Sequence, residues 1–251
     1  MAPVGTPAIL LRAHAYGETS RILRFLTETH GLLSVMARGV RGKTGKGGLT
    51  LVTFASGELT AYVRPHRELQ TMKDFECTRL RARLGSDVLR FAGASAIAEL
   101  VVVHAEQEPR PEIFRALELG LDRLEDVAPE LVPAACLSGL WRIVAAFGFA
   151  PELDVCIRCA SVLPDDALGR FDLAAGGTLC PSCSENAGGP RLGPLARAQV
   201  RDLGAGRLSP TLSHTRQHLV LVSDFVTFHI AQRPLKSLRF LADMLPASGG
   251  G

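Results

Sequence analysis

The 251-residue sequence has few aromatic side chains and no long uninterrupted apolar segment. Aromatic residues make up 6% of the chain, with one Trp and two Tyr. The apolar run at residues 8–11 ends at Arg12, and the longest later run, at about residues 94–103, contains Glu99. Both runs are too short to span a membrane, and the first is also too short for the core of a signal peptide. The sequence therefore predicts a cytoplasmic protein with no membrane partner.

Common catalytic motifs are also missing from the sequence. It has no Gly-x-x-x-x-Gly-Lys-Ser/Thr phosphate loop, and no Ser/His/Asp or paired-carboxylate arrangement can be identified. His214 and His218 are four residues apart, but the glutamate of a zinc-protease helix is not between them. We therefore expect packing or surface roles for these two histidines. With 47% hydrophobic residues, the chain can bury a sizeable core in one or two domains.

Four of the six cysteines form two close pairs, Cys156 with Cys159 and Cys180 with Cys183. Each Cys-x-x-Cys turn places two sulfurs on one side of the backbone, and two such turns supply the four thiolates of a tetrahedral zinc ion. Because cysteine fills every coordination position, we expect one structural Zn²⁺ ion. The alternative is two disulfides or a redox dithiol, which the lack of a secretory signal disfavours. Cys77 and Cys136 remain and are expected to be buried thiols.

Positive charge is concentrated in the N-terminal third of the chain. Residues 1–80 hold 11 Lys and Arg against 6 Asp and Glu, a net charge of +5, whereas residues 81–251 have a net charge of −2. A local excess of cations indicates that this part of the chain meets a polyanion. Charge alone leaves an ordinary basic surface as the alternative.

The same third reads as short strands separated by glycine and proline. The expected strands are residues 8–15, 21–27, 32–38, 49–63 with a break at Ser56-Gly57, and 69–80. Five strands in about 80 residues favour a small closed barrel, for which the OB-fold is the first choice and an SH3-like barrel the alternative. We place this N-terminal, five-stranded OB-fold, DNA-binding domain at residues 1–81.

A glycine-rich basic loop is expected between the third and fourth strands. Residues 38–48 contain five glycines and four cations, Arg38, Arg41, Lys43 and Lys46. Glycine lets the backbone approach a phosphate closely, and cations can follow a nucleic-acid backbone without reading its sequence. A solvated flexible loop is the alternative. These four cations are our candidate DNA-binding residues, with Arg21 and Arg24 as weaker candidates on a neighbouring strand.

Few aromatic residues in this region can stack on bases. Phe25 and Phe54 occupy core-like positions, which leaves Tyr16 and Tyr62. We therefore expect DNA binding to be dominated by phosphate contacts, sensitive to salt and weakly selective for base.

After Gly85 the apolar residues recur with the period of an α-helix. The expected helices are residues 88–103, a second beginning after Pro111, a third ending near Gly148, and then 195–203, 211–230 and 235–245. A leucine stripe in the last helix is expected to be core: Leu235, Leu238, Leu241 and Leu245. The sequence thus predicts an α+β multidomain chain, with an all-α domain at residues 82–251 that the four-cysteine zinc module interrupts at about 152–190.

Several segments together resemble the bacterial recombination mediator family RecO. They are Arg12 to Arg21, Thr27 to Gly31, Ala37 to Arg41, Phe171-Asp172 with Gly176-Gly177 and Cys180-Pro-Ser-Cys183, and Leu235 to Arg239. The resemblance covers essentially the whole chain. Residues 42–48 contain more glycine than is typical of the family. The resemblance therefore does not imply that this loop is ordered. Zinc is not implied by the family, because some of its members lack these cysteines.

The resemblance implies a DNA repair protein of the RecF pathway with no enzymatic activity. Such a protein binds single- and double-stranded DNA, anneals complementary strands and, with RecR, helps to load RecA onto DNA coated with single-strand-binding protein. Its implied partners are DNA, RecR and the acidic tail of single-strand-binding protein, with RecA and RecF indirect, and its implied location is the nucleoid. Two alternatives remain: a zinc-ribbon transcription or protein-interaction module, and a redox or hydrolytic enzyme that uses the cysteines.

Overall fold

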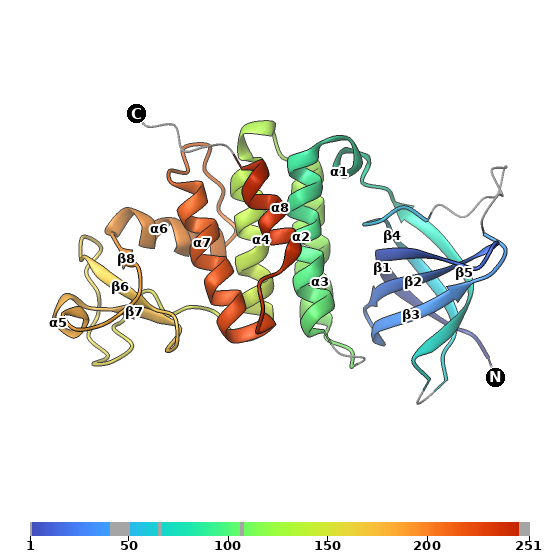
Figure 1. Ribbon diagram of the computed structural model, residues 1–251, viewed down its shortest axis with the longest axis horizontal. Coiled ribbons are helices and arrows are strands. Elements are labelled where there is room, and N and C mark those ends of the chain that lie inside the picture. Colours follow the sequence, from blue (N-terminus) through green and yellow to red (C-terminus); the bar gives the residue numbers. More distant parts are fainter. Residues whose placement is uncertain (1, 41–50, 65–66, 106–107, 246–251) are drawn as a thin grey trace.

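The chain forms three structural parts that follow one another along the long axis of the molecule. The computed structural model describes residues 2–40, 51–64, 67–105 and 108–245. A β-barrel forms one end, a group of helices forms the middle, and a small sheet with the cysteines forms the other end (Figure 1). None of the helices in the described ranges has the length and apolar character that crossing a bilayer requires.

The N-terminal part is a closed five-stranded barrel. Its strands are β1 (Val4–Tyr16), β2 (Ser20–Thr27), β3 (Gly31–Ala37), β4 (Ser56–Tyr62) and β5 (Leu69–Arg79). The strand order is β1-β2-β3-β5-β4, with β4 returning to β1, and β3 pairs in parallel with β5 while every other pair is antiparallel. This Greek-key connection is that of the OB-fold, so the expected barrel is confirmed and the SH3-like alternative is wrong.

The fourth strand starts later than the sequence pattern predicted. Residues 49 and 50 lie outside the described part, residues 51–55 are not in a strand, and β4 begins at Ser56, because the chain turns at Phe54, whose φ of 73° is left-handed. Gly57 is not a break. A Cβ there would lie 2.0 Å from the carbonyl oxygen of Glu76, so glycine lets β4 approach β5 closely at a register shift.

The middle part is helical. Its helices are α1 (Ala82–Ser86), α2 (Val88–His104), α3 (Pro111–Asp126), η1 (Pro129–Leu131), α4 (Val132–Ala146), α6 (Pro194–Gly204), α7 (Thr215–Val226), η2 (Thr227–Ala231) and α8 (Lys236–Met244). The stripe of four leucines at residues 235–245 is buried, as expected. Residues 211–214 are not helical, because His214 is left-handed just before α7, and η2 is a π-helix that follows α7 directly.

The four-cysteine part contains a small sheet that the sequence pattern did not predict. Strand β6 (Gly169–Asp172) lies between β7 (Gly177–Leu179) and β8 (Arg191–Leu192), and the short helix α5 (Pro181–Ser184) follows β7. The fully buried Phe171 of β6 meets Phe225 of α7 edge to face, with ring centroids 5.8 Å apart. This aromatic contact joins the sheet to the helical core.

The barrel and the helices share one apolar core. Ile9, Leu11, Leu26, Leu32 and Phe54 are buried on the outside of the barrel and belong to the same hydrophobic cluster as the helices. The inside of the barrel has a separate cluster around Phe25 and Phe75. Because its outer apolar face is covered by helices, the barrel is held at one place on the helical part.

A buried arginine strengthens this junction. The Arg81 side chain is 1% exposed, and its Nη1 donates hydrogen bonds to the carbonyl oxygen of Phe54 at 2.6 Å and to Oγ of Ser56 at 2.8 Å. Its Nε donates to the Asp122 carboxylate of α3 at 2.8 Å. One guanidinium therefore links the turn before β4 to the helices, in a site where an unpaired charge would be costly.

Replacing Arg81 with methionine is expected to destabilise the whole protein. The side-chain volume is nearly retained, but the buried oxygens of Phe54 and Ser56 lose their donor, and the free energy of unfolding should fall by about 3 kcal/mol. The control is Arg83→Met, because the exposed Arg83 side chain makes only a 3.4 Å contact with the carbonyl oxygen of Glu125, so a loss below about 1 kcal/mol is expected. Urea denaturation monitored by circular dichroism measures both. Equal losses would contradict the role given to Arg81.

Candidate metal centre and nucleic-acid interface

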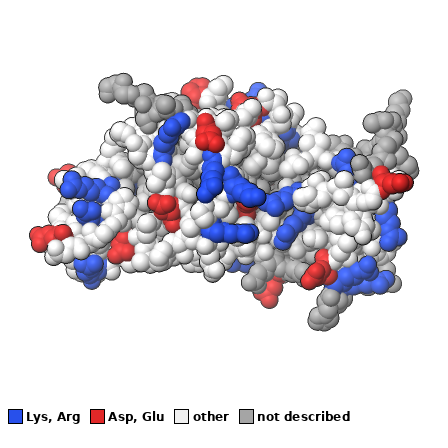
Figure 2. Space-filling model, viewed as in Figure 1, with Lys and Arg blue, Asp and Glu red and all other residues white. Residues whose placement is uncertain are grey.

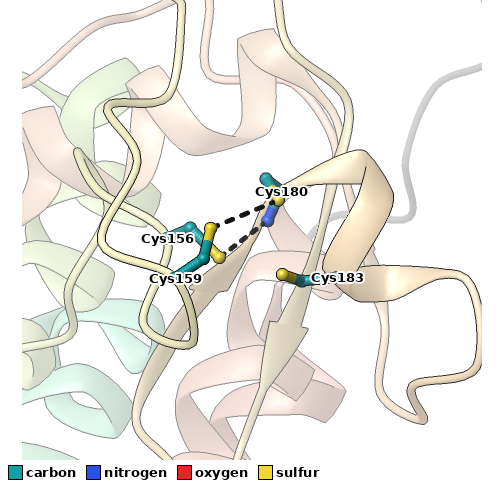
Figure 3. A group of neighbouring side chains, drawn as sticks. All are labelled: Cys156, Cys159, Cys180 and Cys183. Atoms are coloured by element: carbon teal, nitrogen blue, oxygen red, sulfur yellow. Dashed lines mark hydrogen bonds between the residues drawn. The ribbon is translucent and has the colours of Figure 1, made fainter.

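Two turns of the chain bring the four paired cysteines together, as the sequence pattern predicted. The four Sγ atoms all lie within 4.8 Å of one another; they belong to Cys156, Cys159, Cys180 and Cys183. The Sγ atoms of Cys159 and Cys180 are 3.9 Å apart (Figure 3). In a tetrahedral site with zinc–sulfur bonds of about 2.3 Å, sulfurs are about 3.8 Å apart. The cluster therefore fits a tetrahedral metal ion and could hold one.

Local backbone geometry positions these sulfurs. The N–H of Cys156 donates to the carbonyl oxygen of Ser161 at 2.8 Å, and Ala160 between them takes a left-handed φ of 57°. In the second turn, the N–H of Cys180 donates to Sγ of Cys156 at 3.3 Å (Figure 3). Nη1 of Arg158 donates to the carbonyl oxygen of Cys183 at 2.7 Å, which joins the two turns.

The thiols of the cluster differ in acidity. Burial raises the pKa of Cys156, but hydrogen bonds from the N–H groups of Cys180 and Cys159 outweigh burial and lower it to about 6. Side-chain hydrogen bonding with Cys180 and Cys159 raises the pKa of Cys183 to about 12. Opposite shifts are expected where closely spaced thiols cannot all be ionised without a cation among them.

The alternative of two disulfides does not agree with the structure. All six cysteines are free thiols, and a disulfide would need sulfurs about 2.05 Å apart. Of the two cysteines outside the cluster, Cys136 is buried as expected. The expectation for Cys77 is wrong: it is only partly buried, because it lies near the end of β5, where most side chains are exposed.

One end of the barrel collects several of the sequence-predicted candidates for DNA contact. Tyr16 ends β1, and Arg21 in β2 pairs in register with Ala37, the residue before the exposed Arg38. Tyr62 ends β4 in the neighbouring part of the sheet. Tyr16 is 53% and Tyr62 is 36% exposed, so both rings are accessible for stacking. Arg41, Lys43 and Lys46 lie outside the described residues.

Arg24 does not join this end of the barrel. It is three residues from Arg21 and therefore lies on the opposite face of β2, where it pairs in register with Arg12 of β1. Burial and the neighbouring charge of Arg12 lower the pKa of Arg24. The structure thus separates two cations that the sequence pattern had grouped together.

The structure adds two cations to this end that the sequence analysis did not select. Arg64 and Arg67 are exposed in the turn between β4 and β5. The buried Gln70 holds the turn, because it accepts from the N–H of Arg64 at 2.8 Å and donates to the carbonyl oxygen of Arg67 at 2.6 Å. In the sequence, two arginines flank Pro65 between the expected strands, and this pattern was a usable signal. Glu18 and Glu68 are also exposed nearby in the sequence, so the surface is mixed and not purely basic.

The two histidines four residues apart do not form a metal site. Nε2 of the buried His218 is 2.9 Å from Oε1 of Gln199, and burial followed by the charge of His214 lowers the pKa of His218 to about 4. His214 is exposed before α7. The expected packing and surface roles are therefore confirmed.

Comparison with known proteins matches nearly the whole chain to one family. The family model described as recombination protein O N terminal matches residues 1–81, and recombination protein O C terminal matches residues 85–239. A protein of Desulfatibacillum aliphaticivorans named DNA repair protein RecO is 30% identical over 97% of this chain and 98% of its own length. A protein of the same name from Anaeromyxobacter dehalogenans strain 2CP-C is 30% identical over 100% of this chain and 100% of its own length. Another from a Nocardioides species is 31% identical over 93% of this chain and 97% of its own length. The chain therefore belongs to the RecO family of DNA repair and recombination proteins.

Proposed function

We propose that this protein is a non-enzymatic recombination mediator that binds single- and double-stranded DNA and anneals complementary strands. With RecR it assists the loading of RecA onto DNA coated with single-strand-binding protein, in the RecF pathway. The observation that carries the proposal is the barrel end with the half-buried Arg21, the exposed Arg38 and two exposed tyrosines, in a chain of the RecO family. Among the described residues, neither arginine has an ion-pair partner, so both side chains are available to phosphates.

Annealing follows from the physics of such a surface. Two strands repel each other through their phosphates, and cations held between them lower this repulsion. No covalent step is needed. A barrel whose cations contact phosphates and whose tyrosines stack on any base binds with little sequence preference.

In this proposal, residues 1–81 are the main DNA-binding part and residues 82–251 also face protein partners. The division follows the charge, since the first 80 residues have a net charge of +5 and the rest of the chain −2. RecR and the tail of single-strand-binding protein are the direct protein partners, with RecA and RecF acting through the complex. We propose a cytoplasmic, nucleoid-associated location, because the substrate is DNA.

Neutralising the candidate loop is expected to weaken DNA binding without changing specificity. In a variant with Arg38, Arg41, Lys43 and Lys46 replaced by glutamine, the salt dependence of single-strand binding should flatten by up to about 0.7 log units per lost contact. Fluorescence anisotropy with unrelated oligonucleotides over a salt series measures this. The control replaces four exposed cations beyond residue 150 with glutamine: Arg191, Arg207, Arg216 and Arg239. Wild-type affinity and slope in the loop variant would place the DNA elsewhere.

We further propose that Cys156, Cys159, Cys180 and Cys183 bind one structural Zn²⁺ ion. Four thiolates leave no open coordination position, so the ion would stabilise this part and take no part in DNA chemistry. The cluster lies at the end of the molecule opposite the barrel, which agrees with this role (Figure 1).

Replacing Cys156 or Cys180 with serine is expected to release the metal and lower the melting temperature. Elemental analysis gives the metal content, and differential scanning calorimetry gives the melting temperature. Cys77→Ser is the matched control, because Cys77 is outside the cluster and should leave both values unchanged. DNA affinity should stay near the wild-type value in all three variants. A metal-free variant with unchanged stability would contradict a structural role.

An apolar groove in the helical domain is our candidate site for the tail of single-strand-binding protein. It has a volume of about 700 Å³ and is lined by residues of β8, α6 and α7. Leu195 and Val220 are 62% and 58% exposed in it, and Arg191 and Arg216 lie beside them. An acidic tail would need a cation beside an apolar groove, and this groove offers both.

Annealing of coated strands tests this site and the proposed function together. Wild-type protein should anneal complementary strands both bare and coated with single-strand-binding protein. Val220→Asp should lose activity on coated strands only, because it places a negative charge where the acidic tail would bind. Val88→Asp is the control, since Val88 is also 58% exposed but lies on α2 outside the groove. Equal activity of Val220→Asp on both substrates would remove this groove from the proposal.

A further inference from the structure

A second groove, similar in size to the first, lies where the barrel meets the helices. It has a volume of about 680 Å³, and β1, α2 and the segment before α8 form its walls. Its charged and aromatic lining residues include Arg12, Phe91, Glu99, Arg233 and Lys236. Lys and Arg side chains gather over this junction on the face shown in Figure 2. None of the residues selected from the sequence as DNA contacts lines this groove.

Cations outnumber acids in the groove, and its one acid is already engaged. The Glu99 carboxylate accepts from the N–H of Ser237 at 2.9 Å and from its hydroxyl at 2.5 Å, and lies 3.7 Å from Arg12. It therefore caps the first turn of α8 from α2. Arg233 and Lys236 are exposed, and the described part of the chain contains no ion-pair partner for either.

The positive surface continues onto the barrel. Arg24 lies directly opposite Arg12 in the β1–β2 pairing, and its Nε is buried without a hydrogen-bond partner in the described structure. Like charges directly opposite each other on a sheet are unfavourable. An anion beside this pair would relieve both the repulsion and the missing hydrogen bond.

Apolar surface lies next to these cations. Phe91 is 42% exposed, and its ring packs against that of Phe54 with centroids 5.9 Å apart, so the ring is fixed in place while one part remains accessible. Val103, one of the lining residues, is 38% exposed. A held aromatic ring beside unpaired cations is the arrangement that binds bases and phosphates of a single strand.

We propose that this groove binds a single-stranded nucleic-acid segment, with phosphates at Arg233, Lys236 and Arg12 and a base against Phe91. The proposal rests on the DNA-binding function and deepens it: the strand would leave the barrel end, pass Arg24 and Arg12, and enter the helical domain. The barrel end and the groove would then make separate contributions to binding.

Loss of the two unpaired cations tests the phosphate contacts. Arg233→Gln combined with Lys236→Gln should lower affinity for an oligo-dT strand and flatten the salt dependence by about 1.4 log units, which corresponds to two contacts. Arg115→Gln combined with Arg207→Gln removes the same charge away from the groove and should leave the slope nearly unchanged. Unchanged affinity and slope in the groove variant, with wild-type protein binding normally, would overturn the inference alone. Absence of oligo-dT binding by the wild type would contradict the proposed function as well.

A tryptophan in the groove tests the base contact. The only native tryptophan, Trp141, is 1% exposed, so Phe91→Trp adds an accessible reporter whose fluorescence should be quenched when oligo-dT stacks on it. Phe228→Trp is the control, because Phe228 is 57% exposed and does not line the groove, and it should show little quenching. Phe91→Ala should weaken oligo-dT binding about fivefold or more. Quenching by an acidic peptide but not by oligo-dT would assign the groove to a protein partner and overturn the inference.

Discussion

The barrel is held on the helices by a shared apolar core, and one buried guanidinium closes the edge of this interface. Arg81 bonds two oxygens of the turn before β4 and the carboxylate of Asp122 on α3. The neighbouring Arg79 adds ion pairs to Asp122 at 3.2 Å and Asp126 at 3.0 Å, but its side chain is 47% exposed and these pairs contribute little. Because the junction is closed by apolar packing and by this charge, the cations of β1 and those before α8 keep one geometry on either side of the groove.

The parts of the fold that were predictable from the sequence are those set by local patterns. Alternating apolar residues and turn glycines marked five strands, and the spacing of the cysteines marked the metal cluster. The start of β4 was not predictable, because it depends on the left-handed Phe54, a conformation unusual for a residue other than glycine. The small sheet around Phe171 was also missed, since its strands are two to four residues long and exist only through packing against α7.

The candidate DNA surface was only partly predictable for a similar reason. Sequence shows that cations are close along the chain, but not which face of a strand they occupy. The sequence pattern therefore groups Arg21 with Arg24, but the two lie on opposite faces of β2. Phe91, Glu99 and Val103 lie within the expected helix at residues 88–103, but the helical period does not show that they line the groove. Arg233 and Lys236 are more than 200 positions from Arg12 in the sequence, so no local pattern could show that they line one groove.

The π-helix η2 determines how the segment that carries Arg233 and Lys236 is rotated relative to α7. A π-helical turn holds one residue more than an α-helical turn, so residues 227–231 absorb an extra residue within a continuous helix. Deletion of one residue there would restore a regular helix without breaking it. The segment that follows would then be rotated by about 100°, the angle between successive residues of an α-helix. Arg233 and Lys236 would turn away from β1 although no cation had been changed, so the register of this helix, as much as its composition, determines which face of the molecule is positive.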